Sequence, residues 1–388
     1  MVHTRRFRSL SFRSLSMAVC ALAVPVGALL LGGCGGGSNS LHPRPINPDV
    51  TRASITLSDE VYAALGYRRS WTGFAEVGKR AGILFFRTDD DLIIIQDGAS
   101  TITALDVSTG ARRWRTTISS GLSKFVGMAR FGSIIVVCSE SGAFFIDSAT
   151  GTTVERQAFK RVVSTPPLQI GSALLFGTGI GRVFSHDLAS GLSRWENSVG
   201  GTIESAGIVV GGSVAFVSTT GNISFLDPTS NSLRGIGGIY SGTNLRLAAS
   251  NRLLFIASQD QSLYAFSPAS QLPIWQVRTE APLADAPVYH AGVVYCTIAK
   301  SGLTAFDAGT GDRNWTALGV TGEVIGTRAG RLLVWNGSIV TVLDPSDGSV
   351  FSELKLTGVD HLVMDEFSDG NLYATSDEGL VIRLVPNS

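Results

Sequence analysis

The chain has 388 residues, of which 45 are glycine and only 16% are charged. This composition favours many short strands joined by tight turns over helices, so it predicts an all-β fold. Lysine and arginine together number 31, as do aspartate and glutamate. Without a basic excess to neutralise phosphates, the balance argues against nucleic acid as a partner.

The first segment, residues 1–33, has the pattern of a signal peptide. Four arginines and no acidic residue precede an almost wholly apolar stretch, residues 17–31. That stretch is shorter than the about 20 apolar residues that a transmembrane helix needs. It ends in Leu31-Gly32-Gly33-Cys34, which resembles the lipobox of bacterial lipoproteins. The resemblance implies cleavage before Cys34 and acylation of its thiol, which would anchor the mature protein to a membrane.

The residues leave alternatives open in this segment. An ordinary secretory signal with a chance cysteine is one, and Arg5-Arg6 faintly suggests a twin-arginine signal. Translation could also start at Met17, which would remove most of the basic region without affecting the lipobox.

Residues 34–57 have the composition of a flexible tether. Glycine and serine dominate its start, and three spaced prolines favour extended conformations in its middle. Ser58-Asp59-Glu60 then offers a helix N-cap with acidic residues in the first turn, and Gly66 offers a stop. The folded domain is accordingly predicted over residues 58–388.

One pattern recurs with a period of about forty residues. It consists of an apolar strand, an aspartate, then serine or threonine at the third position and glycine at the fourth. The clearest copies have their marker at Asp106, Asp147 and Asp307, and less perfect copies have it at Asp187, Asp227, Ser267 and Asp344, so successive markers are 37 to 41 positions apart. An aspartate accepts hydrogen bonds from backbone N–H groups just downstream, and glycine adopts the positive φ that closes a hairpin. Each marker is therefore interpreted as a folding device and not as a catalytic or metal-binding residue.

Tryptophan stands eight residues after four of these markers, at Trp114, Trp195, Trp275 and Trp315. We expect each ring to lie on the strand after the turn and to pack against the neighbouring unit. Two further apolar runs precede each marker. Four antiparallel strands in about 40 residues are typical of a propeller blade.

The two ends of the folded domain are predicted to share one blade. Residues 372–384 supply inner strands of an eighth unit, but no fourth strand follows them. Residues 67–71 form an orphan strand that ends in Trp71 and can take that place. The sequence thus predicts an eight-bladed β-propeller of four-stranded antiparallel blades, closed by an N-terminal strand in the last blade.

The repeated motif, as in the segment TALDVSTGARRW of residues 103–114, resembles the PQQ-type propeller repeat. The resemblance extends from about residue 67 to residue 388. Together with the lipobox and the blade number, it is similar to the BamB family of outer-membrane protein assembly lipoproteins. It implies a non-enzymatic scaffold without a cofactor, held by its lipid in the outer membrane and facing the periplasm. Its partners would be envelope proteins such as the β-barrel assembly machinery. No partner-binding residue is carried over, because the loop with which this family engages its barrel partner is not found in the sequence.

Two other functions stay open. A sensor or carbohydrate-binding propeller would use one rim, to which the glycine-rich loop of residues 235–243, with Tyr240, could contribute. A quinoprotein dehydrogenase would bind pyrroloquinoline quinone and calcium. Such enzymes are considerably longer, and many have a disulfide between adjacent cysteines, whereas Cys138 and Cys296 are 158 positions apart.

The remaining chemistry-bearing residues are interpreted as structural, so no catalytic, cofactor-binding or metal residue is predicted. Asp89-Asp90-Asp91 is expected to be a solvated loop, because three successive carboxylates cannot all point at one ion. Cys138 and Cys296 are expected to be buried strand residues. The scattered histidines lack metal or nucleophile spacing and are His42, His186, His290 and His361.

Overall fold

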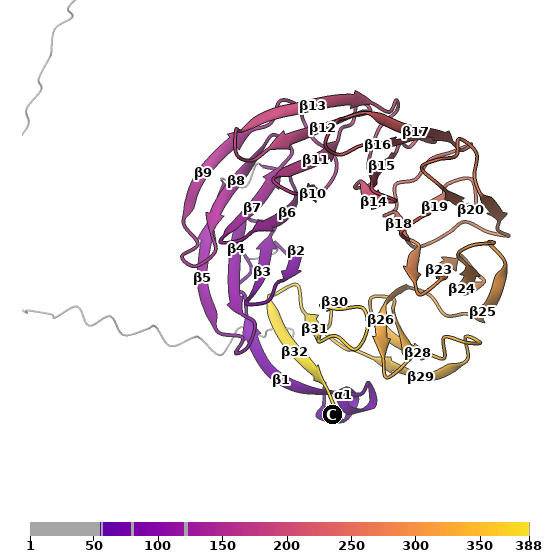
Figure 1. Cartoon of the computed structure of the whole chain (residues 1–388). Helices are drawn as coiled ribbons and strands as arrows, with labels where there is room; N and C mark the ends of the chain where they lie inside the picture. Colours follow the sequence, from indigo (N-terminus) through magenta and orange to yellow (C-terminus); the bar gives the residue numbers. More distant parts are fainter. Residues whose placement is uncertain (1–54, 56, 79–80, 120–122, 388) are drawn as a thin grey trace, which may run out of the picture. The chain divides into compact units, whose positions relative to one another are not determined.

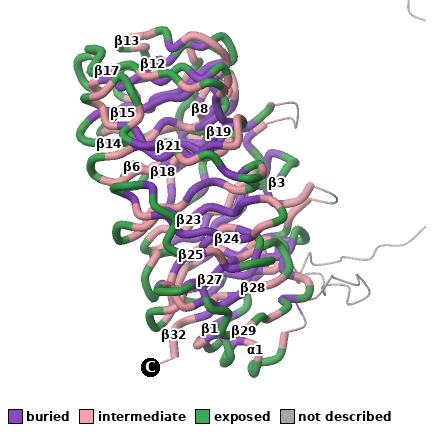
Figure 2. Tube along the Cα trace, turned by 90° about the vertical axis from the view of Figure 1, so that its right-hand side faces the viewer, coloured by how far each residue is buried: buried purple, intermediate pink, exposed green. Residues whose placement is uncertain are grey.

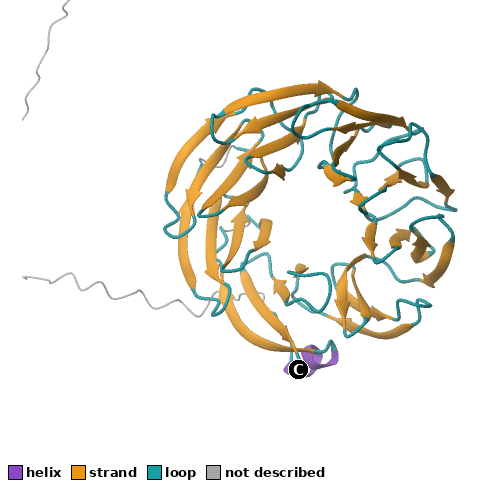
Figure 3. Cartoon of the chain, viewed as in Figure 1, coloured by secondary structure: helices purple, strands orange, loops and turns teal. Residues whose placement is uncertain are grey.

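The computed structural model describes residue 55 and residues 57–387, except 79–80 and 120–122. The predicted signal peptide, Cys34 and most of the predicted tether lie outside the described residues. Eight four-stranded sheets surround a central opening (Figure 1). Figure 3 shows strands and loops almost throughout, with helix α1 (Asp59–Ala64) beside the C-terminal end. The predicted eight-bladed all-β propeller is confirmed.

Each blade is an antiparallel sheet, and in blades 1 to 7 the strands follow one another in chain order from the central opening to the outside (Figure 1). Blade 1 contains β2 (Ile83–Thr88), β3 (Leu92–Asp97), β4 (Thr101–Asp106) and β5 (Arg112–Thr117), and blade 2 contains β6 (Phe125–Phe131), β7 (Ile134–Ser139), β8 (Gly142–Asp147) and β9 (Thr153–Ala158). Blade 3 contains β10 (Leu168–Ile170), β11 (Ala173–Gly177), β12 (Arg182–Asp187) and β13 (Leu192–Ser198), and blade 4 contains β14 (Ile208–Val210), β15 (Ser213–Val217), β16 (Asn222–Leu226) and β17 (Leu233–Gly238).

The second half of the ring repeats this order. Blade 5 contains β18 (Ala248–Ala249), β19 (Leu254–Ser258), β20 (Ser262–Phe266) and β21 (Trp275–Arg278), and blade 6 contains β22 (Val288–His290), β23 (Val293–Ile298), β24 (Gly302–Asp307) and β25 (Arg313–Leu318). Blade 7 contains β26 (Glu323–Arg328), β27 (Arg331–Trp335), β28 (Ile339–Leu343) and β29 (Val350–Lys355), and blade 8 contains β30 (His361–Met364), β31 (Leu372–Thr375), β32 (Leu380–Pro386) and β1 (Tyr67–Phe74).

Blade 8 joins the two ends of the described chain. Strand β1 pairs antiparallel with β32, with Tyr67 opposite Pro386 at one end and Phe74 opposite Leu380 at the other. The predicted closure by an N-terminal strand is confirmed. No helix among the described residues is long and apolar enough to cross a membrane.

The second and third strands of each blade form the core, because neighbouring blades cover both of their faces. All six residues of β3 and all five of β15 and β19 are buried. The burial colours of Figure 2 show purple segments inside and green or pink ones at the edges. Continuous apolar runs in the sequence, in place of strict alternation, are the signature of such strands.

The predicted turn device is confirmed in detail. One carboxylate oxygen of Asp106 accepts hydrogen bonds from the backbone N–H groups of Ser108 at 3.0 Å and Thr109 at 2.9 Å. Gly110 follows with φ of +71°. Hydrogen bonds from the Ser108 hydroxyl and the Arg113 guanidinium hold the pKa of Asp106 well below its ordinary value. Equivalent aspartate-to-backbone bonds occur at Asp147, Asp227, Asp307 and Asp344.

The predicted tryptophan contacts are confirmed, and they have a fixed geometry. The indole N–H of Trp114 in blade 1 donates to the carbonyl of Ser148 in blade 2 at 2.7 Å, one residue after the marker of that blade. A methyl group placed on Gly151 would lie 2.6 Å from the Trp114 ring. The glycine therefore closes the turn and also admits the neighbouring ring. Corresponding indole bonds are made by Trp71, Trp195, Trp275 and Trp315.

Arg328 of blade 7 connects both ends of the domain. Its guanidinium donates to the carbonyls of Gly66, at 3.0 Å, and of Asn387. It also pairs with Asp369 at 2.9 Å. Gly66 ends the predicted helix region with φ of +79°, as expected, although the Ser58 side chain makes no cap hydrogen bond.

Candidate functional site

The propeller has two rims that carry different loops. In an antiparallel blade, the turns between strands one and two and between strands three and four lie on the same rim. We call this the turn rim, since it holds the Asp-x-x-Thr-Gly turns. The opposite rim, here called the interblade rim, holds the turns between strands two and three and the connections from each blade to the next.

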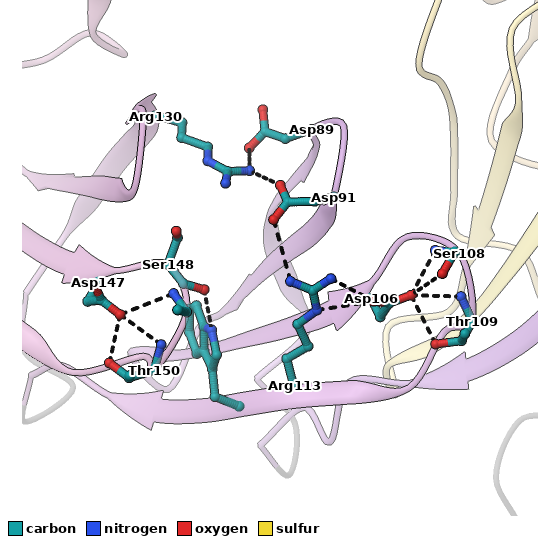
Figure 4. A network of polar contacts seen from close by, with 12 residues as sticks. Asp89, Asp91, Asp106, Ser108, Thr109, Arg113, Arg130, Asp147, Ser148 and Thr150 are labelled. Carbon is teal, nitrogen blue, oxygen red and sulfur yellow. Dashed lines mark hydrogen bonds and ion pairs between the residues drawn. The ribbon is translucent and has the colours of Figure 1, made fainter.

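On the turn rim, a network of charges joins blades 1 and 2 (Figure 4). Arg130 of β6 pairs with Asp91 at 2.5 Å and with Asp89 at 3.5 Å, and Arg113 of β5 pairs with Asp106 at 2.7 Å and Asp91 at 3.5 Å. The Asp89 side chain is only 12% exposed. Asp89 also pairs with Arg87 at 2.9 Å, so the prediction of a solvated loop is wrong for Asp89, whereas the Asp91 side chain stays 43% exposed although it is paired. The loop does lie between the first two strands of blade 1, as predicted.

The cysteines and histidines of the described residues lie apart. Cys138 in β7 and Cys296 in β23 are buried without a disulfide, and burial raises the pKa of the Cys296 thiol to about 12. His186 is buried with one ring nitrogen 2.8 Å from Gln157, and burial lowers its pKa. His290 stacks on Phe367. Within the part of the chain that is described, no three histidine, cysteine or carboxylate side chains group as a metal site.

The other predicted histidines and the glycine-rich loop also have definite places. His361 lies 3.1 Å from Asp377, whereas His42 lies outside the described residues. The expectation of a loop at residues 235–243 is wrong for residues 235–238, which belong to the outer strand β17. Gly235 and Gly237 allow β17 to pack closely on blade 5. A methyl group on Gly235 would lie 2.3 Å from a backbone oxygen of that blade. Tyr240 follows, 92% exposed on the interblade rim.

On the interblade rim, three cations converge on one carboxylate. Lys160 and Arg161 belong to the connection from blade 2 to blade 3, and Arg182 begins β12. Their nitrogens lie 3.5, 3.1 and 3.7 Å from the carboxylate oxygens of Glu196 in β13. Partial burial raises the pKa of Glu196, but hydrogen bonds from Arg161 and Lys160 outweigh that effect and hold it below its ordinary value. The group keeps two uncompensated positive charges.

Two exposed apolar side chains belong to the same loops. Val162, next to Arg161, is 65% exposed, and Ile180, two residues before Arg182, is 70% exposed. Buried Val163 fixes the first loop through a backbone hydrogen bond to Glu140 at 2.8 Å, which leaves the preceding residues outside. The four charged residues and these two apolar residues are here called the Glu196 patch.

A cavity of about 770 Å³ occupies the central opening beside blades 5 to 8. Its walls include the inner strands β18, β22, β26 and β30, and β18 contributes two alanines. Arg246, Asp285 and Glu323 frame its mouth at the interblade rim, since all three lie in or next to connections between blades.

The loop between β30 and β31 contributes to the wall of this cavity at the turn rim. Phe367 from that loop lines the cavity and stacks on His290, with ring centroids 4.2 Å apart. The carbonyl of Phe367 accepts a 2.6 Å hydrogen bond from the backbone of Thr327 in β26. Blade 8 thus contacts blades 6 and 7 at the turn rim.

Comparison with known proteins agrees with this architecture. The family model described as "Outer membrane protein assembly factor BamB" matches residues 66–273 and 232–358. The chain belongs to this family. BamB from Moraxella catarrhalis has 20% sequence identity and a TM-score of 0.53, over 81% of this chain and 85% of that one. The computationally designed protein Ika8 has 13% identity and a TM-score of 0.66, over 81% of this chain and all of the other. At these identities the two structures show a shared fold alone. No curated protein matches the chain.

Sequence reasoning missed both the Glu196 patch and the central cavity. Glu196 lies 35 positions from Arg161, and only the pairing of blades 2 and 3 brings them together. The run Lys160-Arg161-Val162 was the available signal, since a basic and apolar run in a connection between blades has no place in the core. The cavity had a weaker signal, the consecutive alanines of β18 where other blades begin with larger residues.

Proposed function

We propose that this BamB-family propeller is a non-enzymatic envelope lipoprotein that acts as a protein-binding scaffold in the assembly of outer-membrane β-barrel proteins. In this proposal, acylated Cys34 holds the mature chain to the outer membrane on the periplasmic side, and residues 34–57 serve as the tether. The partner is the β-barrel assembly machinery. The name of the family supports the assembly role, and the Glu196 patch supplies a docking surface.

The single observation that carries the proposal is the composition of the Glu196 patch. A lone exposed apolar side chain is ordinary on a protein surface. Here Val162 and Ile180 are exposed within two residues of Arg161 and Arg182, which keep charge that Glu196 does not neutralise. Arginine is enriched among the energetically important residues of protein interfaces, and the buried core of an interface is more apolar than the rest of the protein surface.

The charges also indicate which partner surface fits. Lys160, Arg161 and Arg182 against one carboxylate leave a positive patch, so the complementary surface is acidic and has an apolar centre. Opposite charges speed association and fix orientation more than they add to affinity. Binding through this patch should therefore weaken as salt rises, because exposed charges are screened over about 8 Å at physiological ionic strength.

Charge reversal tests the proposal. In the variant Lys160→Glu, Arg161→Glu, Arg182→Glu, the tagged chain purified from membranes should lose most of its co-purifying barrel-assembly subunits, measured by quantitative mass spectrometry. The matched control reverses three exposed arginines that have no side-chain partner among the described residues. These are Arg68, Arg115 and Arg252.

The control has the same change in net charge and should retain the subunits. A glutamine triple variant at the three patch positions, with an unchanged melting temperature, separates lost docking from misfolding. Equal recovery of the assembly subunits with the patch variant and the control would refute docking through this patch. If the unaltered chain brings down none of these subunits, the assembly role itself is wrong.

A further inference from the structure

The central cavity has a negative mouth, and this charge limits what it can bind. Arg246 and Glu323 pair with each other across the mouth, and the carboxylate of Asp285 has no partner among the described residues. Among the described residues, no lysine and no second arginine lines the cavity. One negative charge is thus left over. A polyanion such as a quinone tricarboxylate would meet one cation, Arg246, whose side chain is 70% exposed and already paired.

Two aromatic side chains form part of the wall. Tyr289 of β22 stacks on Phe255, with ring centroids 5.6 Å apart and planes inclined by 19°, so one face of its ring is supported from behind. Trp335 ends β27 and is half-buried. Both rings line the cavity, and the indole N–H of Trp335 has no acceptor within the described part of the chain. Aromatic faces carry partial negative charge and attract cations.

The size of the cavity suits a ligand or an inserted side chain. A volume of about 770 Å³ falls within the roughly 300–1,000 Å³ that small-molecule sites occupy. Phe367 lines the cavity from a loop on the turn rim, whereas Asp285 and Glu323 lie at the interblade rim. Trp335 is the cross-strand partner of Glu323, so a molecule that enters from the interblade rim meets the carboxylates and this ring together.

We propose that this cavity binds an organic cation, an amine or a guanidinium group, between the Asp285 and Glu323 carboxylates and the rings of Tyr289 and Trp335. The cation arrives as a free molecule or as the lysine or arginine side chain of a polypeptide that enters from the interblade rim. This inference is independent of the assembly role and of the positively charged Glu196 patch on blades 2 and 3, since it concerns a negatively charged cavity beside blades 5 to 8.

Calorimetric titration of the full mature chain with arginine amide tests it, with citrulline amide as the neutral probe of the same shape. Arginine amide should bind with millimolar or tighter affinity, and citrulline amide at least about tenfold more weakly, a difference of about 1.4 kcal/mol. Quenching of Trp335 fluorescence should accompany binding and should be absent in Trp335→Phe.

Two variants and a control locate the site. Asp285→Asn should weaken arginine amide about tenfold, and Glu323→Gln should also weaken it, each with an unchanged melting temperature. Glu204→Gln removes an exposed carboxylate without a partner in the described chain, on the same rim but outside the cavity, and should have no effect.

A short neutral peptide with one central arginine distinguishes the two sources of the cation, a free molecule and a polypeptide side chain. Tighter binding than arginine amide identifies a polypeptide side chain, and equal or weaker binding identifies a free cation.

The proposal is overturned by equal affinity for arginine amide and citrulline amide, by no binding of arginine amide at about 10 mM, or by unchanged binding in Asp285→Asn. Tighter binding of N-acetylglucosamine or pyrroloquinoline quinone than of arginine amide would overturn it as well.

Discussion

The fit of the tryptophan of one blade over the turn glycine of the next can be tested with one methyl group. In Gly151→Ala, the added methyl would lie 2.6 Å from the ring of Trp114, which is buried and hydrogen-bonded to Ser148. Real methyl groups do not approach so closely, so the ring or the turn has to shift. Gly171→Ala is the matched control, because Gly171 also has positive φ, +55°, yet nothing lies within 4 Å of the added methyl.

Both substitutions carry the cost of a left-handed backbone with a side chain, about 1–2 kcal/mol. Gly151→Ala adds the cost of overpacking, which is typically about 1–3 kcal/mol. We therefore expect Gly151→Ala to lower the free energy of unfolding by about 2 kcal/mol more than Gly171→Ala, which corresponds to roughly 3 °C in melting temperature for a domain of this size.

Urea and thermal unfolding, followed by circular dichroism, measure this difference. Trp114→Ala alone should cost about 3–5 kcal/mol. In the Trp114→Ala background, the substitution Gly151→Ala should cost no more than Gly171→Ala, because the overlapping ring is gone. Equal destabilisation by the two alanine substitutions in the unaltered chain would refute the assignment of Gly151 to the contact between blades.

Three further predictions concern the closure of the ring, the proposed lipid anchor and the stability of one turn. Arg328→Ala should lower the free energy of unfolding by about 3 kcal/mol, since charged hydrogen bonds to the ends of the domain are lost. Amide hydrogen exchange should accelerate in β1 and β32 but not in blades 3 to 5. Uniform acceleration would contradict the role of Arg328 in closure. Cys34→Ala should move the protein from the membrane to the soluble fraction, and unchanged membrane retention would disprove the anchor. Hydrogen bonds from the Ser230 backbone and from Arg234 lower the pKa of Asp227, so its stabilising effect is present above about pH 4 and is lost as the pH falls from the unfolded pKa through the folded pKa. The urea midpoint of unfolding should therefore fall in acid, and it should fall less steeply in Asp227→Asn. A urea midpoint that does not change with pH would be inconsistent with this.

The sequence was sufficient for the fold because the information is local and repeated. Asp106 and Gly110 specify a turn through bonds within five residues, and the same turn returns in blade after blade. No marker precedes Trp71 by eight residues, but Trp71 could still be assigned to the last blade because its spacing from Trp114 is close to the period. Closure of the ring followed from counting strands.

The site could not be predicted in the same way, because it depends on contacts between blades. Asp89 and Asp91 formed an acidic run in the sequence, and only the pairing of blade 1 with blade 2 places Arg130 beside them. The glycines of β17 indicated a loop, since glycine is depleted in strands. Close packing on blade 5 outweighs that preference at Gly235.

Site-specific photo-crosslinking in the native cell envelope tests the central claim most directly. A photoreactive residue at Val162 reports on the Glu196 patch. One at Val154, an exposed valine on the outer strand β9, serves as the control. The account predicts a discrete adduct with a subunit of the β-barrel assembly machinery at Val162 and none at Val154. Adducts with that machinery at Val154 but not at Val162, or at neither position, would contradict it.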